Sequence, residues 1–290
     1  MPAALAATAP AKVNLTLRVL GRRADGYHDL ESLVAFADFG DRLTLTLGAE
    51  LALAVGGPRA ALAGADADNL VLKAARALAE RVPGIVSGTF QLEKNLPVAA
   101  GLGGGSADAA AALRLLARAN GLAPDDPRLY AAARATGADV PVCLDPRPRL
   151  MRGIGEILSE PLILPPLQAV LVNPGVALAT KAVFAGWTPP AKPGAPLDGM
   201  ALAKAAGHEQ FLQLLMTQPN DLEGAAITLA PAIAEVLAAL CALPGCTLAR
   251  MSGSGTTCFG LFAYAAAAQS ATTALTNKYP HWWVRATALG

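Results

Sequence analysis

The sequence predicts an α+β protein of two domains, and three observations lead to this fold class. Apolar and polar residues alternate with a period of two in segments such as Leu43–Leu47 and Thr89–Glu93, which is typical of half-buried strands. A glycine-rich run, Gly101–Gly105, precedes an alanine-rich stretch of helical length. The pattern restarts beyond Pro146–Pro161, and 290 residues are enough for two ordinary domains. We therefore expect two α+β domains that meet near this segment.

The first half of the chain begins with an expected half-buried strand over Val13–Val19, in which a period of two puts Lys12 and Asn14 on the polar face. Glycines at 121 and 137 stand where we expect helices to end, and Pro127 suits a first helical turn. The further expected elements are a turn at Asp25-Gly26, a strand over 43–47 with a partner strand over 51–55, a helix capped by Asp68 that runs to about Arg81, a strand over 89–93, a helix over 106–120 and a helix over 127–137.

In the second half, the segment Pro146–Arg152 holds three arginines and reads as a connection between the domains. The tryptophans at 282 and 283 are expected to be structural. The further expected elements are a strand over 167–172, a turn at Asn173-Pro174-Gly175, a proline-rich loop over 189–196, helices over 200–216 and 222–240, strands over 247–251 and 256–262, a final helix and a strand over 282–287.

Composition and charge exclude several classes of protein. A net charge of +1 gives no field to attract nucleic acid or an anionic membrane, so we expect neither as a partner. The uncharged stretches 161–180 and 251–277 are too rich in proline or polar residues to span a bilayer. The first ten residues lack the basic start of a signal peptide, and the four cysteines form no CxxC, so we expect free thiols and a cytoplasmic location.

The strongest local signal is the glycine-rich segment itself. Consecutive glycines let backbone N–H groups point toward one position, and the following helix adds the positive end of its dipole. The segment therefore predicts a phosphate site, although a plain strand-to-helix loop has the same pattern. It has no lysine for a Walker A loop, and Ser106 stands where a dinucleotide fingerprint needs glycine. The segment reads Pro97, Val98, Ala99, Ala100, Gly101, Leu102, Gly103, Gly104, Gly105, Ser106, Ala107.

This segment resembles the phosphate loop of the GHMP kinases, a family that phosphorylates small alcohols with ATP. Two further motifs follow the family's order along nearly the whole chain, Pro10–Leu15 near the start and Met251–Gly255 near the end. The resemblance implies an N-terminal domain like the second domain of ribosomal protein S5, with a left-handed βαβ unit, and a ferredoxin-like α/β C-terminal domain. We expect these domains at 1–155 and 156–290, in a monomer or a weak homodimer.

Five markers make the chain most similar to the members of the family that phosphorylate a cytidine-diphosphate-linked alcohol. They are Arg23–His28, Asp68-Asn69-Leu70, Gly137–Val142, Gly153–Glu156 and Asn220–Glu223. In this resemblance Asp139 is the general base that takes the proton from the substrate hydroxyl. Lys12 lies beside it, keeps the carboxylate ionised and stabilises charge on the transferred phosphoryl group.

The resemblance also assigns ligand contacts. Tyr27 and His28 hold the cytosine base, Phe184 stacks on its other face, and Asn14 and Lys94 place the substrate. Asn69 and Leu70 lie near the adenine, the loop over 252–255 closes on the phosphate region, and Mg²⁺ arrives with ATP, with Ser106 as a candidate ligand, Asp108 as a weaker one and no dedicated metal cage. Core packing for Phe184, a helix start for Asn69 and a tight turn for 252–255 are the alternatives.

Two departures from the family pattern stand out. Ala99 and Ala100 occupy positions where close relatives often have glycine, and the segment with Arg147, Arg149 and Arg152 matches poorly, which leaves its role open. The alternatives for function are another kinase of the family, of the homoserine or mevalonate type, or a non-catalytic sensor of ATP and a metabolite. The pair Tyr27-His28 and the motif Gly137–Pro141 argue against the first, and the presence of both Lys12 and Asp139 argues against the second.

Overall fold

The structure is a computed structural model that describes residues 4–63, 68–189, 197 and 207–290. The chain divides into two compact units, each assembled from several segments. Unit 1 holds Met1–Lys12, Phe39–Val98 and Gly103–Pro146, and unit 2 holds Val13–Asp38, Ala99–Leu102 and Arg147–Gly290. The expected proline-rich loop at 189–196 and the first part of the expected helix at 200–216 lie outside the described residues. The expected domain boundary at 155/156 stays a prediction.

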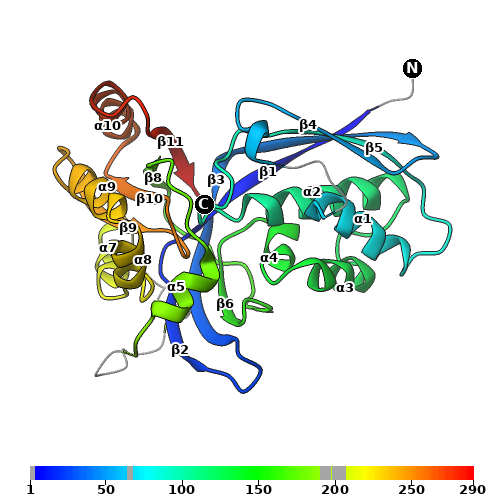
Figure 1. Ribbon diagram of the computed structural model, residues 1–290, viewed down its shortest axis with the longest axis horizontal. Helices are drawn as coiled ribbons and strands as arrows, with labels where there is room; N and C mark the ends of the chain where they lie inside the picture. The colour runs from blue at the N-terminus through cyan, green and yellow to red at the C-terminus, as the bar shows by residue number, and fades with distance from the viewer. Residues whose placement is uncertain (1–3, 64–67, 190–196, 198–206) are drawn as a thin grey trace. The chain divides into compact units, whose positions relative to one another are not determined.

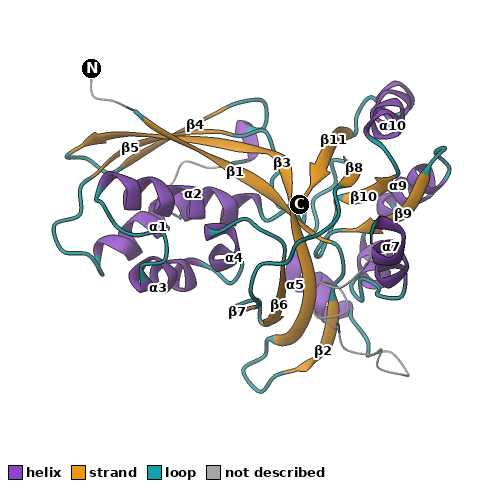
Figure 2. Cartoon of the chain, turned by 180° about the vertical axis from the view of Figure 1, so that it is seen from behind, coloured by secondary structure: helices purple, strands orange, loops and turns teal. Residues whose placement is uncertain are grey.

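Unit 1 is a sheet with helices packed on it (Figures 1 and 2). Strand β5 runs antiparallel to β3 and parallel to β4, and β1 pairs with β3. Helix α1 packs against α2 and α3, and α2 packs against α4. The elements are β1 (Leu5–Asn14), the second half of β3 (His28–Gly48), β4 (Ala52–Gly56), a short 3-10 turn η1 (Ala60–Leu62), α1 (Leu70–Ala79), β5 (Ser87–Glu93), α2 (Gly104–Ala119), α3 (Pro127–Thr136) and α4 (Val140–Leu144).

The alternation of β5 explains how this sheet is covered. Phe90 and Leu92 are buried, whereas Thr89, Gln91 and Glu93 are exposed, so one face meets the core and the other meets solvent. Leu43 of β3 lies opposite Leu92 and continues the buried face. One expectation was wrong: β4 does not partner the Leu43–Leu47 strand but adds to the far side of β5, because β5 occupies that edge of β3.

Unit 2 is centred on an antiparallel sheet with the order β3-β11-β8-β10-β9. Helix α10 packs on β8 and β11, and α9 packs on β9 and β10. A smaller group of strands, β2, β6 and β7, extends from the first half of β3. The elements are β2 (Arg18–Arg22), β6 (Arg149–Gly153), β7 (Ile157–Leu158), β8 (Leu167–Asn173), α5 (Thr180–Gly186), α7 (His208–Met216), α8 (Glu223–Leu229), α9 (Ala232–Cys241), β9 (Cys246–Met251), β10 (Cys258–Phe262), α10 (Ala265–Lys278) and β11 (Trp283–Leu289).

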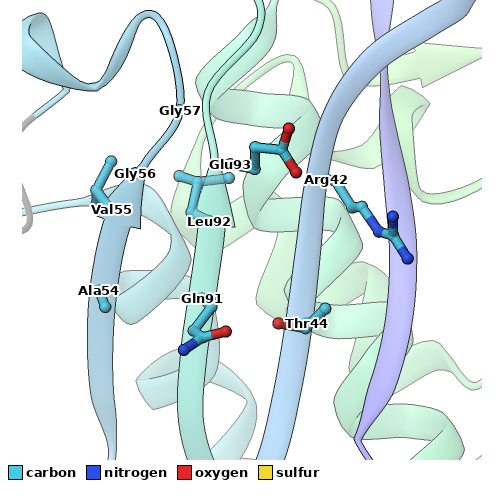
Figure 3. Close-up of a pocket in the computed structure, with 9 residues that line it drawn as sticks. All are labelled: Arg42, Thr44, Ala54, Val55, Gly56, Gly57, Gln91, Leu92 and Glu93. Carbon is cyan, nitrogen blue, oxygen red and sulfur yellow. The ribbon is translucent and has the colours of Figure 1, made fainter.

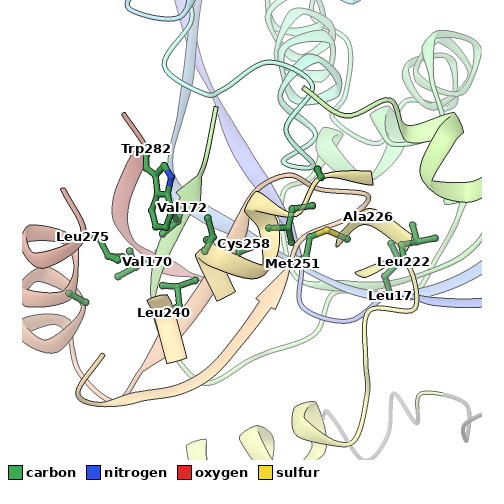
Figure 4. Packing of buried hydrophobic residues seen from close by; sticks show 14 of the residues in the cluster. Leu17, Val170, Val172, Leu222, Ala226, Leu240, Met251, Cys258, Leu275 and Trp282 are labelled. Carbon is green, nitrogen blue, oxygen red and sulfur yellow. The ribbon is translucent and has the colours of Figure 1, made fainter. Parts of the chain in front are cut away.

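The core of unit 2 is one apolar cluster under these helices (Figure 4). Val172 of β8 lies opposite Cys258 of β10, and both side chains are fully buried. Trp282 belongs to the cluster and stacks on Tyr279 with ring centroids 3.8 Å apart, as expected for a structural tryptophan. The four cysteines are free thiols, as the sequence predicted. In the described part of the chain, no helix combines the length and apolarity needed to cross a membrane.

Three local expectations were wrong, each for a physical reason. Residues 11–19 are buried on both faces, and the strand breaks after Asn14, so the alternation there does not mark a solvent face. Asn69 rather than Asp68 caps α1, since its Oδ1 accepts a hydrogen bond from the Val71 N–H at 3.0 Å. The expected helix at 222–240 is two helices, α8 and α9, with Pro231 at the N-cap of the second.

The segment expected to be a connection also has a different structure. Residues 149–153 form β6, which pairs antiparallel with Leu30–Val34 of β3. The guanidinium of Arg152 lies 2.9 Å from the carboxylate of buried Glu31, and Arg149 donates to the carbonyl of Ser159 at 2.8 Å. Both arginines therefore have partners inside unit 2, where they hold the edge of this small sheet.

Candidate active site

The glycine-rich segment leads directly into α2, and its backbone has the left-handed turns that glycine favours. The φ angles of Ala99, Gly101 and Gly103 are 51°, 76° and 62°. Gly103 is the N-cap of α2 and, having no side chain, leaves the first N–H groups of the helix open to an outside acceptor. A left-handed conformation is uncommon for a residue with a side chain, so Ala99 stands at a position that favours glycine.

The two glycines of this segment that most need to be glycine lie in different units. In unit 1, a Cβ on Gly103 would lie 3.1 Å from Cε of Lys12, so the start of α2 lies directly against the predicted catalytic lysine. In unit 2, a Cβ on Gly101 would lie 2.4 Å from the carbonyl oxygen of Ser252, so Gly101 lies directly against residues 252–255, the second glycine loop. The backbone contact at Gly101 is too close for any side chain, whereas at Gly103 a side chain would press on that of Lys12.

The predicted catalytic pair is formed within unit 1. Lys12, in β1, has its Nζ 3.1 Å from Oδ2 of Asp139, the N-cap residue of the short helix α4. The lysine side chain is 4% exposed and the aspartate side chain 38% exposed. The buried ammonium is therefore held by the protein, whereas the carboxylate faces outward, as a base that meets a substrate must. Lys12, Asp139 and Gly103 are thus brought together.

An arginine that the sequence analysis missed supports this arrangement. Arg114 of α2 donates hydrogen bonds to the carbonyl of Cys143 in α4 at 2.6 Å and to the carbonyl of Thr8 in β1 at 2.5 Å. It thereby connects the strand that carries Lys12 to the helix that Asp139 begins. Burial lowers the pKa of the Arg114 guanidinium from its usual value. The signal in the sequence was a charged residue on an otherwise alanine- and leucine-rich helix.

Lys94, which the resemblance assigns to substrate placement, is buried between two carboxylates. Its Nζ is 2.5 Å from Oδ2 of Asp41 and 2.8 Å from Oδ2 of Asp108, and all three side chains are buried. A Cβ on Gly104 would lie 3.4 Å from Nζ, so the group lies under the first turn of α2. Burial raises the pKa of the Asp108 carboxyl to about 7, against the attraction of Lys94, because three ionised groups would leave a net negative charge in the interior. The role of Lys94 in placing substrate stays a prediction.

Asp41 was also missed, and it fixes the approach to the glycine-rich segment. Its Oδ1 accepts hydrogen bonds from the N–H groups of Asn95 and Leu96 at 2.6 and 2.9 Å. The same carboxylate therefore holds Lys94 and the two residues that follow it. Nothing local in the sequence marks this aspartate, because its partners lie more than fifty residues away along the chain.

The residues predicted for adenine binding lie beside α2. Asn69 caps α1 and Leu70 is the first residue of that helix. A Cβ on Gly105 would lie 3.4 Å from Cδ1 of Leu70, so the Asn69-Leu70 pair lies at the start of α2 in unit 1. A helix-capping role for Asn69 is established by its hydrogen bond to Val71, and its contact with adenine stays a prediction.

In unit 2, Asn14 and the second glycine loop meet. The Asn14 N–H donates to Oγ of Ser252 at 3.0 Å, and its side-chain amide donates to Oγ of Ser32 at 2.8 Å. The Ser252 hydroxyl donates in turn to the carbonyl of Gly101 at 2.9 Å. One serine therefore joins Asn14 to residues 99–102 of the glycine-rich segment.

The residues predicted to hold cytosine also lie in unit 2. The rings of His28 and Phe184 are stacked with centroids 5.0 Å apart at 26°, and Trp187 meets His28 edge-on at 5.8 Å. Tyr27, in the turn between β2 and β3, is 60% exposed. Phe184 and Trp187 also pack against the core cluster of unit 2. Phe184 therefore contributes to core packing and also stacks on His28. The sequence analysis did not name Trp187. Its spacing of three residues from Phe184 could have indicated that the two aromatic side chains lie on the same side.

Metal ligands are sparse around the helix start. Within the described ranges, no group of three or more His, Cys, Asp or Glu side chains is arranged to hold a metal ion. Ser106 stands in the first turn of α2 with a partly accessible side chain. Asp108, the weaker candidate, has one carboxylate oxygen on Lys94 and is 3% exposed.

Unit 1 also has a hollow of about 450 Å³ that contains none of the predicted site residues (Figure 3). It lies on the solvent face of β3, β4 and β5. The cross-strand neighbours Arg42 and Glu93, and Thr44 and Gln91, line it together with the backbone near Gly57. The hollow follows from small residues on β4 beside longer ones on β5, and it adds no group to the lysine–aspartate pair.

A glycine-rich helix start beside a buried lysine and an outward-facing carboxylate defines a class of protein, the phosphotransferases that act on an alcohol. Comparisons with known proteins agree. The model of the GHMP kinases N terminal domain matches residues 69–145, and the model of the GHMP kinases C terminal domain matches residues 200–281. The chain belongs to the GHMP kinases and is an ATP-dependent kinase of a small molecule.

The relatives specify the family branch. The chain is 59% identical over 290 residues to a 4-diphosphocytidyl-2-C-methyl-D-erythritol kinase of Xanthobacter autotrophicus, with 98% of each chain covered. It is 58% identical over 289 residues to the enzyme of that name from Methylobacterium radiotolerans, with 98% of this chain and 99% of the relative covered. The resemblance to this branch and the expected α+β fold are confirmed.

Solved structures of the same family are also similar to this chain. A crystal structure of a 4-(cytidine 5'-diphospho)-2C-methyl-D-erythritol kinase superposes with a TM-score of 0.80 at 37% identity, with 99% of each chain covered. A homoserine kinase from Cytophaga hutchinsonii superposes with a TM-score of 0.72 at 21% identity, with 99% of this chain and 95% of that chain covered. The second likeness shows the shared fold alone.

Proposed function

We propose that the protein transfers the γ-phosphoryl group of ATP to the 2-hydroxyl of 4-diphosphocytidyl-2-C-methyl-D-erythritol, in non-mevalonate isoprenoid precursor biosynthesis. The observation that carries the chemistry is the Lys12–Asp139 pair, 3.1 Å apart, with Gly103 of the glycine-rich segment against the lysine. The choice of substrate is supported by relatives at 59% identity that bear this name, and by the aromatic residues of unit 2.

In the proposed reaction, Asp139 accepts the proton of the substrate hydroxyl as its oxygen attacks the γ-phosphorus. The bond from that phosphorus to the β,γ-bridging oxygen breaks, and ADP leaves with the electron pair. The ammonium of Lys12 stabilises the negative charge that develops on the transferred group. Because Lys12 is buried and ion-paired, it is already oriented before the substrate binds.

The glycine-rich segment is proposed to bind the phosphates of ATP through its backbone N–H groups and through the N-terminus of α2. Asn69 and Leu70 would contact the adenine. Mg²⁺ that accompanies ATP would screen the phosphate oxygens, and the hydroxyl of Ser106 is an oxygen ligand of the kind that this ion accepts. We place the reaction in the cytoplasm, where ATP is available.

For the acceptor substrate, we propose that Tyr27 and Phe184 provide aromatic faces for the cytosine and that His28 provides a hydrogen-bonding ring nitrogen beside them. Phe184 and His28 already stack on each other, so the aromatic surface is formed without a ligand. Stacking of a base on an aromatic ring contributes roughly 1–3 kcal/mol, which is enough to select a cytidine nucleotide over an unsubstituted alcohol. Asn14, and Lys94 through the segment it supports, would place the rest of the substrate.

The test is turnover of ATP with three alcohols offered separately: the cytidine-diphosphate-linked substrate, mevalonate and homoserine. We expect turnover of the first alone, and inhibition by CDP that is competitive with it. Turnover of mevalonate or homoserine without inhibition by CDP would assign the chain to another branch of the family. Binding of ATP and CDP without turnover of any alcohol would indicate a sensor.

A further inference from the structure

The motif Asn220–Glu223 is a family marker to which the proposed mechanism gives no task. It follows α7 and leads into α8. Its backbone forms a parallel bridge with Leu17, in which Leu17 donates to the carbonyl of Pro219 at 3.1 Å and Asp221 donates to the carbonyl of Leu17 at 2.8 Å. The Asp221 carboxylate also accepts from the Val19 N–H at 2.8 Å. The motif is therefore fixed to the chain just beyond Asn14.

The side chain of Asn220 is 6% exposed and uses both ends of its amide. Its Nδ2 donates to the carbonyl oxygens of Met251 and Gly253, each at 2.8 Å, and its Oδ1 accepts from the Leu222 N–H at 3.0 Å. These distances are those of good hydrogen bonds. The two carbonyls stand on either side of Ser252, so one amide group holds both flanks of that serine.

Apolar packing supports the same contact. Leu222, Met251 and Leu17 belong to one buried cluster, and Figure 4 shows Met251 and Leu222 close together in it. Glu223 adds a hydrogen bond, since its Oε2 accepts from the Met251 N–H at 2.9 Å. The motif thus holds the beginning of the second glycine loop both by hydrogen bonds and by apolar packing.

Ser252 is the residue whose position this arrangement decides. It is fully buried, and its hydroxyl joins the N–H of Asn14 to the carbonyl of Gly101. The next residue, Gly253, has a φ of 59°, and a Cβ there would lie 3.1 Å from the Gly101 carbonyl oxygen. Displacement of the loop would therefore move residues 99–102 of the phosphate loop and the backbone of Asn14 together.

We propose that Asn220 is a positioning residue for phosphoryl transfer: it fixes the carbonyls of Met251 and Gly253 so that the Ser252 hydroxyl holds the phosphate loop beside Asn14. The inference rests on the proposed function of that loop. Asparagine is required because two carbonyl oxygens can only accept, and an aspartate of the same shape would place a carboxylate oxygen against both. Misplacement of reacting groups by about 1 Å can lower a rate about 100-fold.

The chain offers a matched control in Asn173. Its side chain is as buried as that of Asn220, and its Oδ1 also accepts from a backbone N–H, that of Gly175, at 2.8 Å. Its Nδ2, however, donates to the hydroxyls of Thr256 and Thr257 at 3.3 and 2.9 Å. The Thr256 hydroxyl already donates to the carbonyl of Val176 at 2.8 Å, but the Thr257 hydroxyl can turn and donate to a carboxylate, which a carbonyl cannot do. Asn173→Asp and Asn220→Asp therefore add the same buried charge against partners of opposite tolerance.

The experiment measures kcat and both KM values for the wild type, Asn220→Asp and Asn173→Asp, with a urea unfolding curve for each protein. We expect kcat of Asn220→Asp to fall about 100-fold and the KM for ATP to rise, because the phosphate loop is displaced. The kcat of Asn173→Asp should stay within about fivefold of wild type. Equal losses in the two variants, or a folded Asn220→Asp with unchanged kcat, would overturn the proposal.

If Asn220→Asp does not fold, Asn220→Ala and Ser252→Ala replace it. Both should reproduce the loss in kcat, and the double variant should lose no more than the larger single loss, because the two residues act through one contact. Additive losses would overturn the proposal.

A separate outcome concerns the proposed function itself. If the wild type turns over none of the alcohols, that function fails, and the affinity for a fluorescent ATP analogue becomes the readout. It should then fall about tenfold in Asn220→Asp and not in Asn173→Asp, and equal affinities would contradict the role of Asn220.

Discussion

Replacing Gly101 by alanine should destabilise unit 2 and reduce turnover, and the structure gives the size of the effect. The residue has a φ of 76°, where a side chain costs about 1–2 kcal/mol. Its Cβ would also lie 2.4 Å from the carbonyl oxygen of Ser252 and 2.9 Å from that of Gly255. Backbone must move to relieve such contacts, which adds about 1–3 kcal/mol. We expect a total loss of about 2–5 kcal/mol in the free energy of unfolding.

Gly84 provides the control because it has the same backbone conformation without the contacts. Its φ is 75°, and nothing lies within 4 Å of the position of a Cβ. Gly84→Ala should therefore cost only the conformational part, about 1–2 kcal/mol. Urea unfolding of both variants, followed by kcat measured on the folded proteins, gives the comparison. Equal stabilities, or a kcat for Gly101→Ala equal to that of Gly84→Ala, would refute the close approach of the two glycine loops.

Three further predictions concern other parts of the protein. Burial raises the pKa of Asp108 from 3.8 to about 7. Above pH 4 the folded state therefore holds a proton that the unfolded state releases. The contribution of this carboxyl to the stability of the folded state is fully present below pH 4 and is lost as the pH rises through 7. Measured by urea unfolding, the stability of Asp108→Asn relative to wild type should therefore be greater at pH 8 than at pH 5. The same difference in free energy of unfolding at both pH values would be evidence against this. Phe184→Ala should raise the KM for the cytidine-linked substrate about tenfold and leave the KM for ATP unchanged in steady-state kinetics, and a rise in both would indicate loss of packing alone. Lys12→Met should lower kcat about 100-fold or more with little change in either KM, whereas unchanged kcat would remove Lys12 from the mechanism.

Local signals in the sequence were enough for elements whose pattern is complete within a few residues. The alternation of Thr89–Glu93, with one face buried, predicted β5, and Pro127 and Gly137 marked both ends of α3. The same method failed for β1, where residues 11–14 are buried on both faces and alanine-rich Leu5–Pro10 has low strand propensity. The partner of β4 could not be read either, because strand order depends on contacts between distant segments.

The candidate site divides in the same way. Motifs that carry several constrained residues in a row located Lys12 and Asp139, and the structure places the two side chains in contact. Asp41, Arg114 and Asn220 were not assigned a role, because each acts on a backbone or side-chain partner about thirty or more residues away. A buried polar side chain must find hydrogen-bond partners, but the sequence does not say which.

We propose that Asp139 takes the proton when ATP phosphorylates a cytidine-diphosphate-linked alcohol. The most direct test is single-turnover phosphorylation of 4-diphosphocytidyl-2-C-methyl-D-erythritol by the wild type and by Asp139→Asn, with binding of ATP and substrate measured by calorimetry. Binding should be retained, and the rate should fall by about 10²–10⁴, the usual contribution of a general base. A variant that phosphorylates this substrate within a few-fold of the wild-type rate would contradict this proposal.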